Sequence, residues 1–421
     1  MISRLVSRCR PGDRESGQAS MVTVAMFMML FSVITVGFTY VMISASRQAV
    51  NDSLQSSAKA AAESGVEDAK RLIVYCYNHR NNDGTYTNPQ DANLCKHIIG
   101  KRADQLEGTD CDDILRAVDS SPQRVNFGLE SVKNNGYRVK VGNGSAGKNS
   151  SNEYYQCLKI ATRTDNYEGI VSNLGKSTVI PLRLVDGKGN PATKITKIEI
   201  QWHRNVDGVE GDGVANLAGT SGTGLPPADK WKSNSHNRPA VLRVERVGVK
   251  KGSFSLNDLV ASDTAVTFRP SSGGGNIVAM NNYHPQYNDR PNSQYPNGVP
   301  IVETKCDGNN YACTMSATDT LYAKNNDYYL RLSAIYKDSH FSIRAYDGSK
   351  ILYFDGVQPL VDVTGSSSDS FSRIQARLKP SFDKNADNTN WWPEYVIDTN
   401  GKVCKDIEVQ YDEGEDRCKY K

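Results

Sequence analysis

The chain has 421 residues, a formal net charge of +3 and a hydrophobic content of 38%. This length accommodates two compact units and an additional segment. Because the charge is nearly balanced, we expect no extended nucleic-acid-binding surface and no nucleic-acid partner. Glycine and tyrosine are frequent, with 34 and 21 residues, which indicates a β-rich domain with long loops rather than a compact α/β enzyme core.

A long uncharged segment lies near the N-terminus. No charged side chain occurs between Glu15 and Arg47, and a membrane-spanning helix needs about 20 apolar residues. We therefore predict a transmembrane helix over residues 18–46, in contact with membrane lipid. Positive flanks stay cytoplasmic, and the span is preceded by Arg4, Arg8, Arg10 and Arg14. This predicts a single-pass cytoplasmic-membrane protein with a cytoplasmic N-terminus and the remaining chain outside.

The helical pattern continues past this span. A secretory signal peptide is the alternative, but its apolar region is shorter and ends at a small-residue cleavage site. Here apolar or small residues recur every three or four positions in a narrow stripe, which predicts an α-helix. The stripe consists of Val50, Leu54, Ala58, Ala61, Gly65, Ala69, Leu72 and Cys76. Because small residues let backbones approach closely, we expect the positions from Val50 to Leu72 to pack against other helices. Together, span and stripe predict one helix over residues 18–77, about 90 Å long, with an amphipathic stalk over 47–77.

Two segments of this helix region carry a family resemblance. Residues 15–19 (ESGQA) resemble the end of a type IV prepilin leader, and residues 60–69 (AAAESGVEDA) resemble the helix signature of PilX-type minor pilins. The resemblance covers roughly the first 75 residues. It implies that prepilin peptidase removes residues 1–17 by cutting after Gly17, so that Gln18 becomes the mature N-terminus. The implied partners are other pilin subunits and the pilus assembly machinery, and the implied destination is an extracellular pilus on a bacterial cell surface.

Two positions depart from the pattern of major pilins. Their fifth mature residue is a glutamate, where this chain has Val22, and they usually begin with Phe, where this chain has Gln18. The resemblance therefore favours a minor or tip subunit over a major one. The alternative is a membrane-anchored or pilus-borne adhesin whose surface or host-cell ligand is unknown.

The cysteines are consistent with a domain outside the cytoplasm. Cys9 lies in the leader, and an even number remains, as is typical of disulfides in an oxidising compartment. The candidates are Cys76, Cys95, Cys111, Cys157, Cys306, Cys313, Cys404 and Cys418. The local pairs Cys306–Cys313 and Cys404–Cys418 are the easiest to close, and the other pairings stay open. Zinc is the alternative to disulfides, but no CxxC pair occurs and no histidine lies at ligand spacing. The Cys404–Cys418 loop also resembles the C-terminal loop of pilins.

The remaining chain alternates between strand patterns and loop patterns. Alternation with period two predicts half-buried antiparallel strands at 137–141, 193–202, 241–247, 327–336, 341–346 and 374–378. Stretches rich in Gly, Asn, Ser or Pro predict loops at 142–152, 205–228, 271–300 and 364–369. Residues 328–332, 354–358, 363–365 and 374–377 also resemble a pilin-type sheet.

These patterns predict an α+β fold, in which a long N-terminal helix precedes a mainly antiparallel β domain. The predicted division is a leader (1–17), the long helix (18–77), a helical and irregular disulfide-containing region (78–150), a β-sandwich-like module (151–305) and a C-terminal β module (306–421) that ends in the Cys404–Cys418 loop.

No motif predicts catalysis or a cofactor. The histidines form no HExxH, no GxSxG elbow occurs, and residues 169–177 have five residues between the glycines where a P-loop needs four. The spacing of Asp383, Asn385, Asp387 and Glu394 matches a calcium loop. Asn388 replaces the glycine of that loop, so we favour a solvated turn over a calcium site and expect a protein that is not an enzyme.

Overall fold

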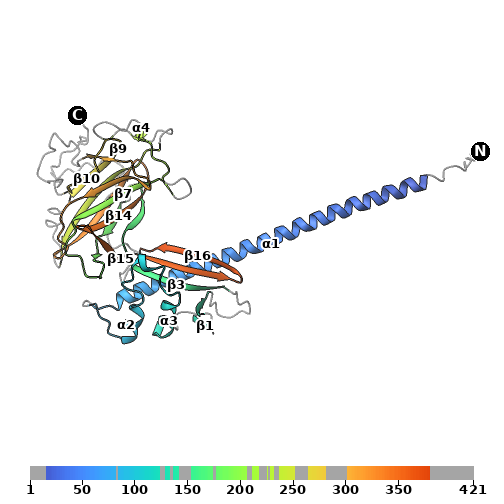
Figure 1. Ribbon diagram of the computed structural model, residues 1–421, viewed down its shortest axis with the longest axis horizontal. Coiled ribbons are helices and arrows are strands. Elements are labelled where there is room, and N and C mark those ends of the chain that lie inside the picture. Colours follow the sequence, from blue (N-terminus) through green and yellow to red (C-terminus); the bar gives the residue numbers. More distant parts are fainter. Residues whose placement is uncertain are drawn as a thin grey trace, which may run out of the picture.

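The computed structural model describes residues 16–81, 84–123, 129–132, 136–141, 153–173, 177–205, 211–217, 225, 228–231, 237–251, 264–280 and 301–379. A single long helix projects from a β-rich part of the molecule, which we call the head (the described residues after Asn78; Figure 1). The predicted α+β class, with a long apolar N-terminal helix and a large, mainly antiparallel β domain, is confirmed.

Helix α1 (Ser16–Asn78) is continuous over 63 residues, as the uninterrupted pattern predicted. No proline occurs in it to remove a backbone donor. Its N-terminal half lies clear of the head, whereas its C-terminal half packs against β3 (Glu153–Thr164), β15 (Lys350–Ser367) and β16 (Ser370–Arg377) (Figure 1).

The sheet behind the helix is antiparallel throughout, in the order β1 (Leu129–Val132), β2 (Gly136–Lys140), β3, β15, β16. Its helix-facing side forms a first core with the end of α1 and with α2 (Pro89–Cys95) and α3 (Asp113–Asp119). The short helix η1 (Ala103–Gln105) lies against β3. Tyr155, Leu158, Val361 and Val363 are buried there, so this side of the sheet is covered by helices.

The same sheet continues into a second unit, a sandwich of two sheets. Its further strands are β4 (Tyr167–Val171), β6 (Leu184–Val185), β7 (Lys197–Arg204), β10 (Ile277–Val278), β12 (Tyr311–Ala317) and β14 (Ser339–Asp347). The facing sheet has the order β11 (Ile301–Lys305), β9 (Thr264–Ser271), β8 (Val241–Lys250), β13 (Asn326–Ile335), β5 (Thr178–Pro181). Trp202 and Phe268 stack between the two sheets with centroids 6.1 Å apart. A second hydrophobic core therefore holds the sandwich together.

Strand β15 belongs to both cores. Its first residues pair with β14 and β6 in the sandwich, and Leu360–Ser367 pair with β3 and β16 behind the helix. The register shifts between Asp355 and Leu360, and Gly356 adopts a φ of 73°, which favours glycine. A Cβ at Gly356 would lie 2.5 Å from the Tyr77 hydroxyl. This glycine thus forms the joint between the two units.

Two expectations need correction. Strands from the predicted modules 151–305 and 306–421 pair with each other in both sheets, β3 with β15 and β8 with β13. Residue 305 is therefore no boundary between separately built sheets, because antiparallel partners need not be close in sequence. The loop predicted at 364–369 is also wrong for its first part, since β15 continues to Ser367.

The six strands predicted from alternation are present as β2, β7, β8, β13, β14 and β16. Their ends shift by a few residues, most at β7, which begins at Lys197 rather than at residue 193, and at β16, which begins at Ser370 rather than at residue 374.

Candidate functional site

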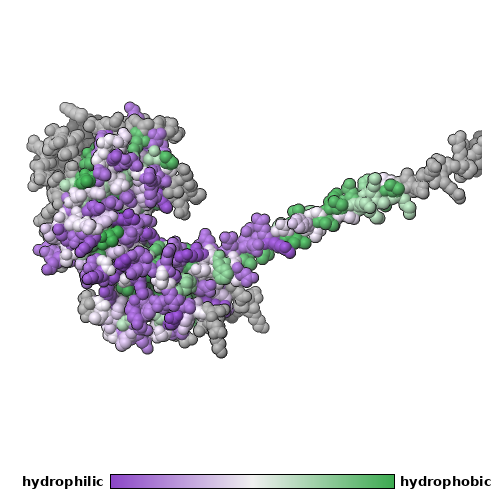
Figure 2. All heavy atoms as spheres, in the orientation of Figure 1, coloured by the Kyte–Doolittle hydropathy of each residue, from purple (hydrophilic) through white to green (hydrophobic). Residues whose placement is uncertain are grey.

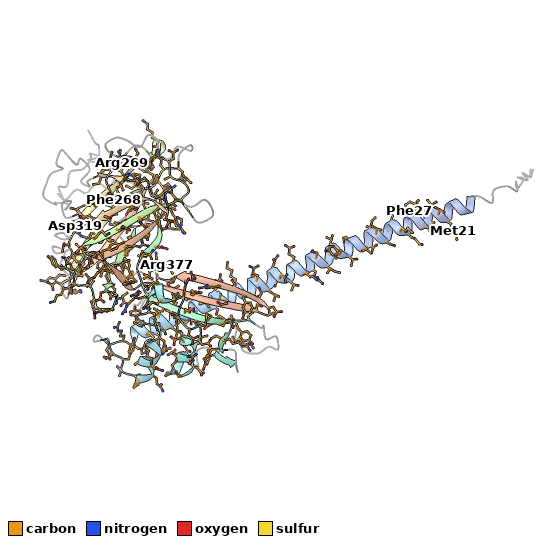
Figure 3. All side chains as sticks on the ribbon, in the orientation of Figure 1. Met21, Phe27, Phe268, Arg269, Asp319 and Arg377 are labelled. Carbon is orange, nitrogen blue, oxygen red and sulfur yellow. A yellow bond between two sulfur atoms is a disulfide. The ribbon has the colours of Figure 1, made fainter. Side chains whose placement is uncertain are left out.

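The projecting half of α1 presents a continuous apolar surface (Figure 2). Its large side chains are exposed, including Met21 at 78%, Phe31 at 64% and Tyr40 at 77%. Figure 3 shows Met21 and Phe27 far from the head. Soluble monomers rarely expose contiguous apolar patches of this size, and the helix is long and apolar enough to cross a membrane. This half is therefore the strongest candidate for a functional surface.

Polar groups in the projecting half bond within the helix. The hydroxyls of Ser32, Thr35 and Thr39 donate to the carbonyl oxygens four residues earlier, each at 2.7 Å. This satisfies donors that would otherwise be costly in an apolar surrounding. The half thus suits contact with lipid chains or with other apolar helices.

The other half of α1 is committed to the head. Ala58, Ala61 and Ala69 are fully buried, and a Cβ at Gly65 would lie 2.6 Å from Cγ1 of Val363 and 2.9 Å from Cγ of Tyr155. Small residues thus bring the helix backbone onto the sheet. The expected packing of this stripe on helices of other subunits is wrong from Ala58 onward, because its partners are the chain's own β-sheet and its helices α2 and α3.

Only the beginning of the predicted stripe stays outside the head core. Val50 is exposed at 54%, and Leu54 is half-buried, whereas Ala69, Leu72 and Cys76 lie in the first core. A stripe of small residues indicates close packing but does not specify its partner.

A hydrogen bond and a disulfide fasten the packed half. The Tyr155 hydroxyl donates to Oδ2 of Asp68 at 2.9 Å. Burial raises the pKa of both Asp68 and Tyr155, so the phenol keeps the proton that it donates. Cys76 bonds to Cys95 with their Cα atoms 5.4 Å apart, which ties the end of α1 to α2.

Two further disulfides lie in the head. Cys111 pairs with Cys157, and Cys306 pairs with Cys313. The second is the local pair predicted from spacing, and it closes the turn between β11 and β12. Cys404 and Cys418 lie outside the described residues, as does the candidate calcium loop of Asp383, Asn385, Asp387 and Glu394. Within the described part of the chain, no three His, Cys, Asp or Glu residues are placed to hold a metal.

The candidate processing site lies at the start of α1. Gly17 and Gln18 are in the first helical turn, which begins at Ser16, and the preceding residues lie outside the described part of the chain. A prediction of cleavage after Gly17 therefore stays a prediction.

A polar cluster lies at one end of the sandwich, and no sequence pattern predicts it. The carboxylate of Asp212 accepts hydrogen bonds from the Ser339 hydroxyl at 2.9 Å and from the His340 amide at 3.0 Å. Burial opposes its ionisation, but hydrogen bonds from His340 and Ser339 outweigh burial and hold the pKa of Asp212 below its usual value. His203 lies beside it, 3.8 Å from Nδ1 to Oδ2.

His203 itself is unusual in backbone and side chain. It is fully buried, its φ is 61°, and neither ring nitrogen has a hydrogen-bond partner among the described residues. Burial and the positive charge of Lys337 lower its pKa to about 4. It is therefore a neutral imidazole inside the protein. The four residues of this cluster come from two stretches of sequence, and Asp212 and Ser339 are 127 positions apart, so no motif reveals them.

Comparison of the chain with protein-family models, with curated proteins and with solved structures finds no match.

Proposed function

We propose that the chain is a minor subunit of a type IV pilus-like filament that displays its β-rich head on the cell surface. One observation carries the proposal, namely the division of a single continuous helix into two halves. The half from Met21 to Ile43 is uncharged and exposed, while the half from Ala58 to Cys76 belongs to the head core. Such a helix can pass from lipid into a helix bundle without any change in the head.

The physical basis is that both surroundings are apolar. In the membrane, α1 contacts lipid chains, and in a filament its projecting half contacts the corresponding halves of other subunits. Helices associate in apolar surroundings through packing rather than through the hydrophobic effect. These contacts involve only residues before Ala58, since the stripe that follows is already buried in the head.

Three further features support this role. The six described cysteines form disulfides, which is typical of proteins outside the cytoplasm. Residues 15–19 resemble a prepilin leader, so prepilin peptidase and the assembly machinery are the proposed partners. Val22 replaces the glutamate of major pilins, which favours a minor or tip position.

The proposal predicts the N-terminus of the mature chain. Mass spectrometry of the exported protein should find Gln18 as its first residue, and the protein should co-purify with sheared filaments. Gly17→Leu should abolish both results, because it places a branched side chain at the proposed cleavage bond. Gly273→Ala is the control, since it lies in the head, away from α1 in sequence, and a Cβ there meets no atom within 4 Å.

Exported wild-type protein with Met1 intact would contradict the proposal and favour a plain membrane anchor. If deletion of the gene abolished adhesion while filaments persisted, the adhesin alternative would gain support over a structural role.

A further inference from the structure

A lysine and an asparagine that are distant in sequence meet at one end of the sandwich. Lys337 lies in the turn between β13 and β14, and Asn237 lies just before β8. Nζ of Lys337 is 2.9 Å from Oδ1 of Asn237 across a separation of 100 residues. This hydrogen bond places the lysine amine beside the Asn237 amide, in which Cγ is the carbon bonded to Oδ1.

The surrounding hydrogen bonds orient the Asn237 side chain. Its Nδ2 donates to the backbone carbonyls of Asp212 at 2.6 Å and of Val214 at 3.1 Å. Two carbonyl oxygens can face only the NH₂ side of an amide, so Oδ1 must point toward the lysine. The amide thus presents its carbonyl to the amine and its NH₂ group to the opposite side.

Both segments are held in place. The Trp231 ring stacks on Tyr336 with centroids 5.5 Å apart, and its Nε1 donates to the carbonyl of Pro239 at 3.0 Å. Tyr336 precedes the lysine, and Pro239 follows the asparagine by two positions. The φ of Tyr336 is 79°, a conformation that side chains rarely adopt and that is common at functional sites. The turn is therefore held in a strained form that aims Lys337 at Asn237.

The local electrostatics favour the reactive form of the amine. Burial lowers the pKa of Lys337, although the charge of Asp212 partly opposes this. A larger fraction of the amine is therefore neutral, and only the neutral form is nucleophilic. The Asp212 carboxylate and the His203 ring lie in the same cluster.

We propose that Lys337 and Asn237 form an intramolecular isopeptide bond between Nζ and Cγ. The lone pair of Nζ attacks Cγ, a C–N bond forms, and the π electrons of the carbonyl move to Oδ1. A proton passes from Nζ to Nδ2, which makes the nitrogen of the amide a leaving group. The Cγ–Nδ2 bond then breaks, the carbonyl re-forms, and ammonia leaves. The step exchanges one amide for another and needs no oxidant, reductant or metal.

The bond has a mechanical role in this fold. It ties the segment that enters β8 to the turn that connects β13, the neighbour of β8 in the same sheet, with β14 of the other sheet. Force that separates β8 from β13 at this end would then act on a covalent bond in addition to hydrogen bonds. This inference does not depend on whether the chain enters a filament.

Mass spectrometry of the full mature chain, reduced and denatured, tests the proposal. After proteolysis, we expect a branched peptide that joins the segments of residues 237 and 337. The mass of the intact chain should be lower than calculated by one ammonia molecule. An N-terminal Gln18 can also cyclise with loss of ammonia, so the branched peptide is the decisive observation. Its absence from correctly folded wild-type protein would overturn the inference.

Two variants sharpen the test. Lys337→Arg keeps a positive donor beside Asn237 but has no nucleophilic amine, so it should lose the branched peptide and melt at a lower temperature. Lys251→Arg is the matched control, because the ammonium of that exposed lysine donates to the Ala323 carbonyl and pairs with Asp327. It should keep the branched peptide. A branched peptide in Lys337→Arg would equally contradict the assignment.

Discussion

Glycines on both sides of one interface bring α1 and the sheet into contact. Gly65 on the helix faces Val363 and Tyr155, and Gly365 on β15 faces the backbone of Ala58 and Ala62. Flexible side chains can move aside, but backbone atoms of a packed helix cannot. The two glycines are therefore not equivalent, and Gly365 is the less tolerant position.

Gly365→Ala should lower the free energy of unfolding of the head by about 3 kcal/mol, in the upper part of the range for overpacked cores. Its Cβ would clash with the carbonyl oxygen of Ala58 and the amide nitrogen of Ala62. Urea denaturation followed by circular dichroism measures the change. Gly273→Ala serves as the control, because a Cβ there meets nothing within 4 Å. Equal stability of the two variants would show that the contact is looser than described.

Among the elements, the joint between the two units depends on charged side chains as well as on Gly356. The Arg163 guanidinium donates to Oδ1 of Asp355 and to the carbonyl of Gly100, both at 3.1 Å. Arg377, labelled at the joint in Figure 3, donates to the carbonyl and the side chain of Asn166. Arg163 thus links β3, β15 and the segment before η1.

Arg163→Ala should destabilise the protein by about 2–3 kcal/mol. It leaves the largely buried Asp355 without its charged partner, which costs more than losing a surface pair. Lys70→Ala is the control. Its partner Glu67 lies 3.8 Å away, both side chains are about half exposed, and such pairs contribute about 1 kcal/mol or less. Thermal denaturation of both variants at one pH compares the losses, and a similar small loss in both would count against Arg163 as a link.

Local patterns predict some of these elements better than others. The helix was predictable because Ser16 to Asn78 contains no proline and no turn cluster, and β8 and β13 show clear alternation. The length of β15 was not predictable, because Gly356 and Pro359 interrupt its alternating pattern. The contacts of Lys337 with Asn237 and of Arg163 with Asp355 join residues 100 and 192 positions apart, so no local signal exists for them.

At the scale of the whole molecule, one part of α1 limits solubility in water, and another part contributes to the stability of the head. The projecting half accounts for the large apolar surface, whereas the residues from Ala58 onward complete the first core. Removing the first part should therefore change how the protein behaves in water without changing how the head folds.

A chain that begins at Asn51 and is made in an oxidising compartment should be monomeric without detergent and should melt at the temperature of the full chain. A chain that begins at Ser64 lacks Ala58, Ala61 and Ala62, which leaves part of β15 uncovered. Its melting temperature should fall by about 5 °C or more. Size-exclusion chromatography and thermal denaturation check both. Aggregation of the chain from Asn51 would reveal a second apolar surface on the head.

Because β15 belongs to both cores, it also determines the order in which they can form during folding. A chain is synthesised from its N-terminus, so β3 appears long before β15, its central partner in the sheet behind α1. The Arg163–Asp355 contact alone spans 192 residues, and non-local pairings of this kind slow folding. Neither core can close until β15 has been made, and until then the edge of β3 stays open to wrong partners. The head must therefore acquire its two cores together and late, rather than one after the other.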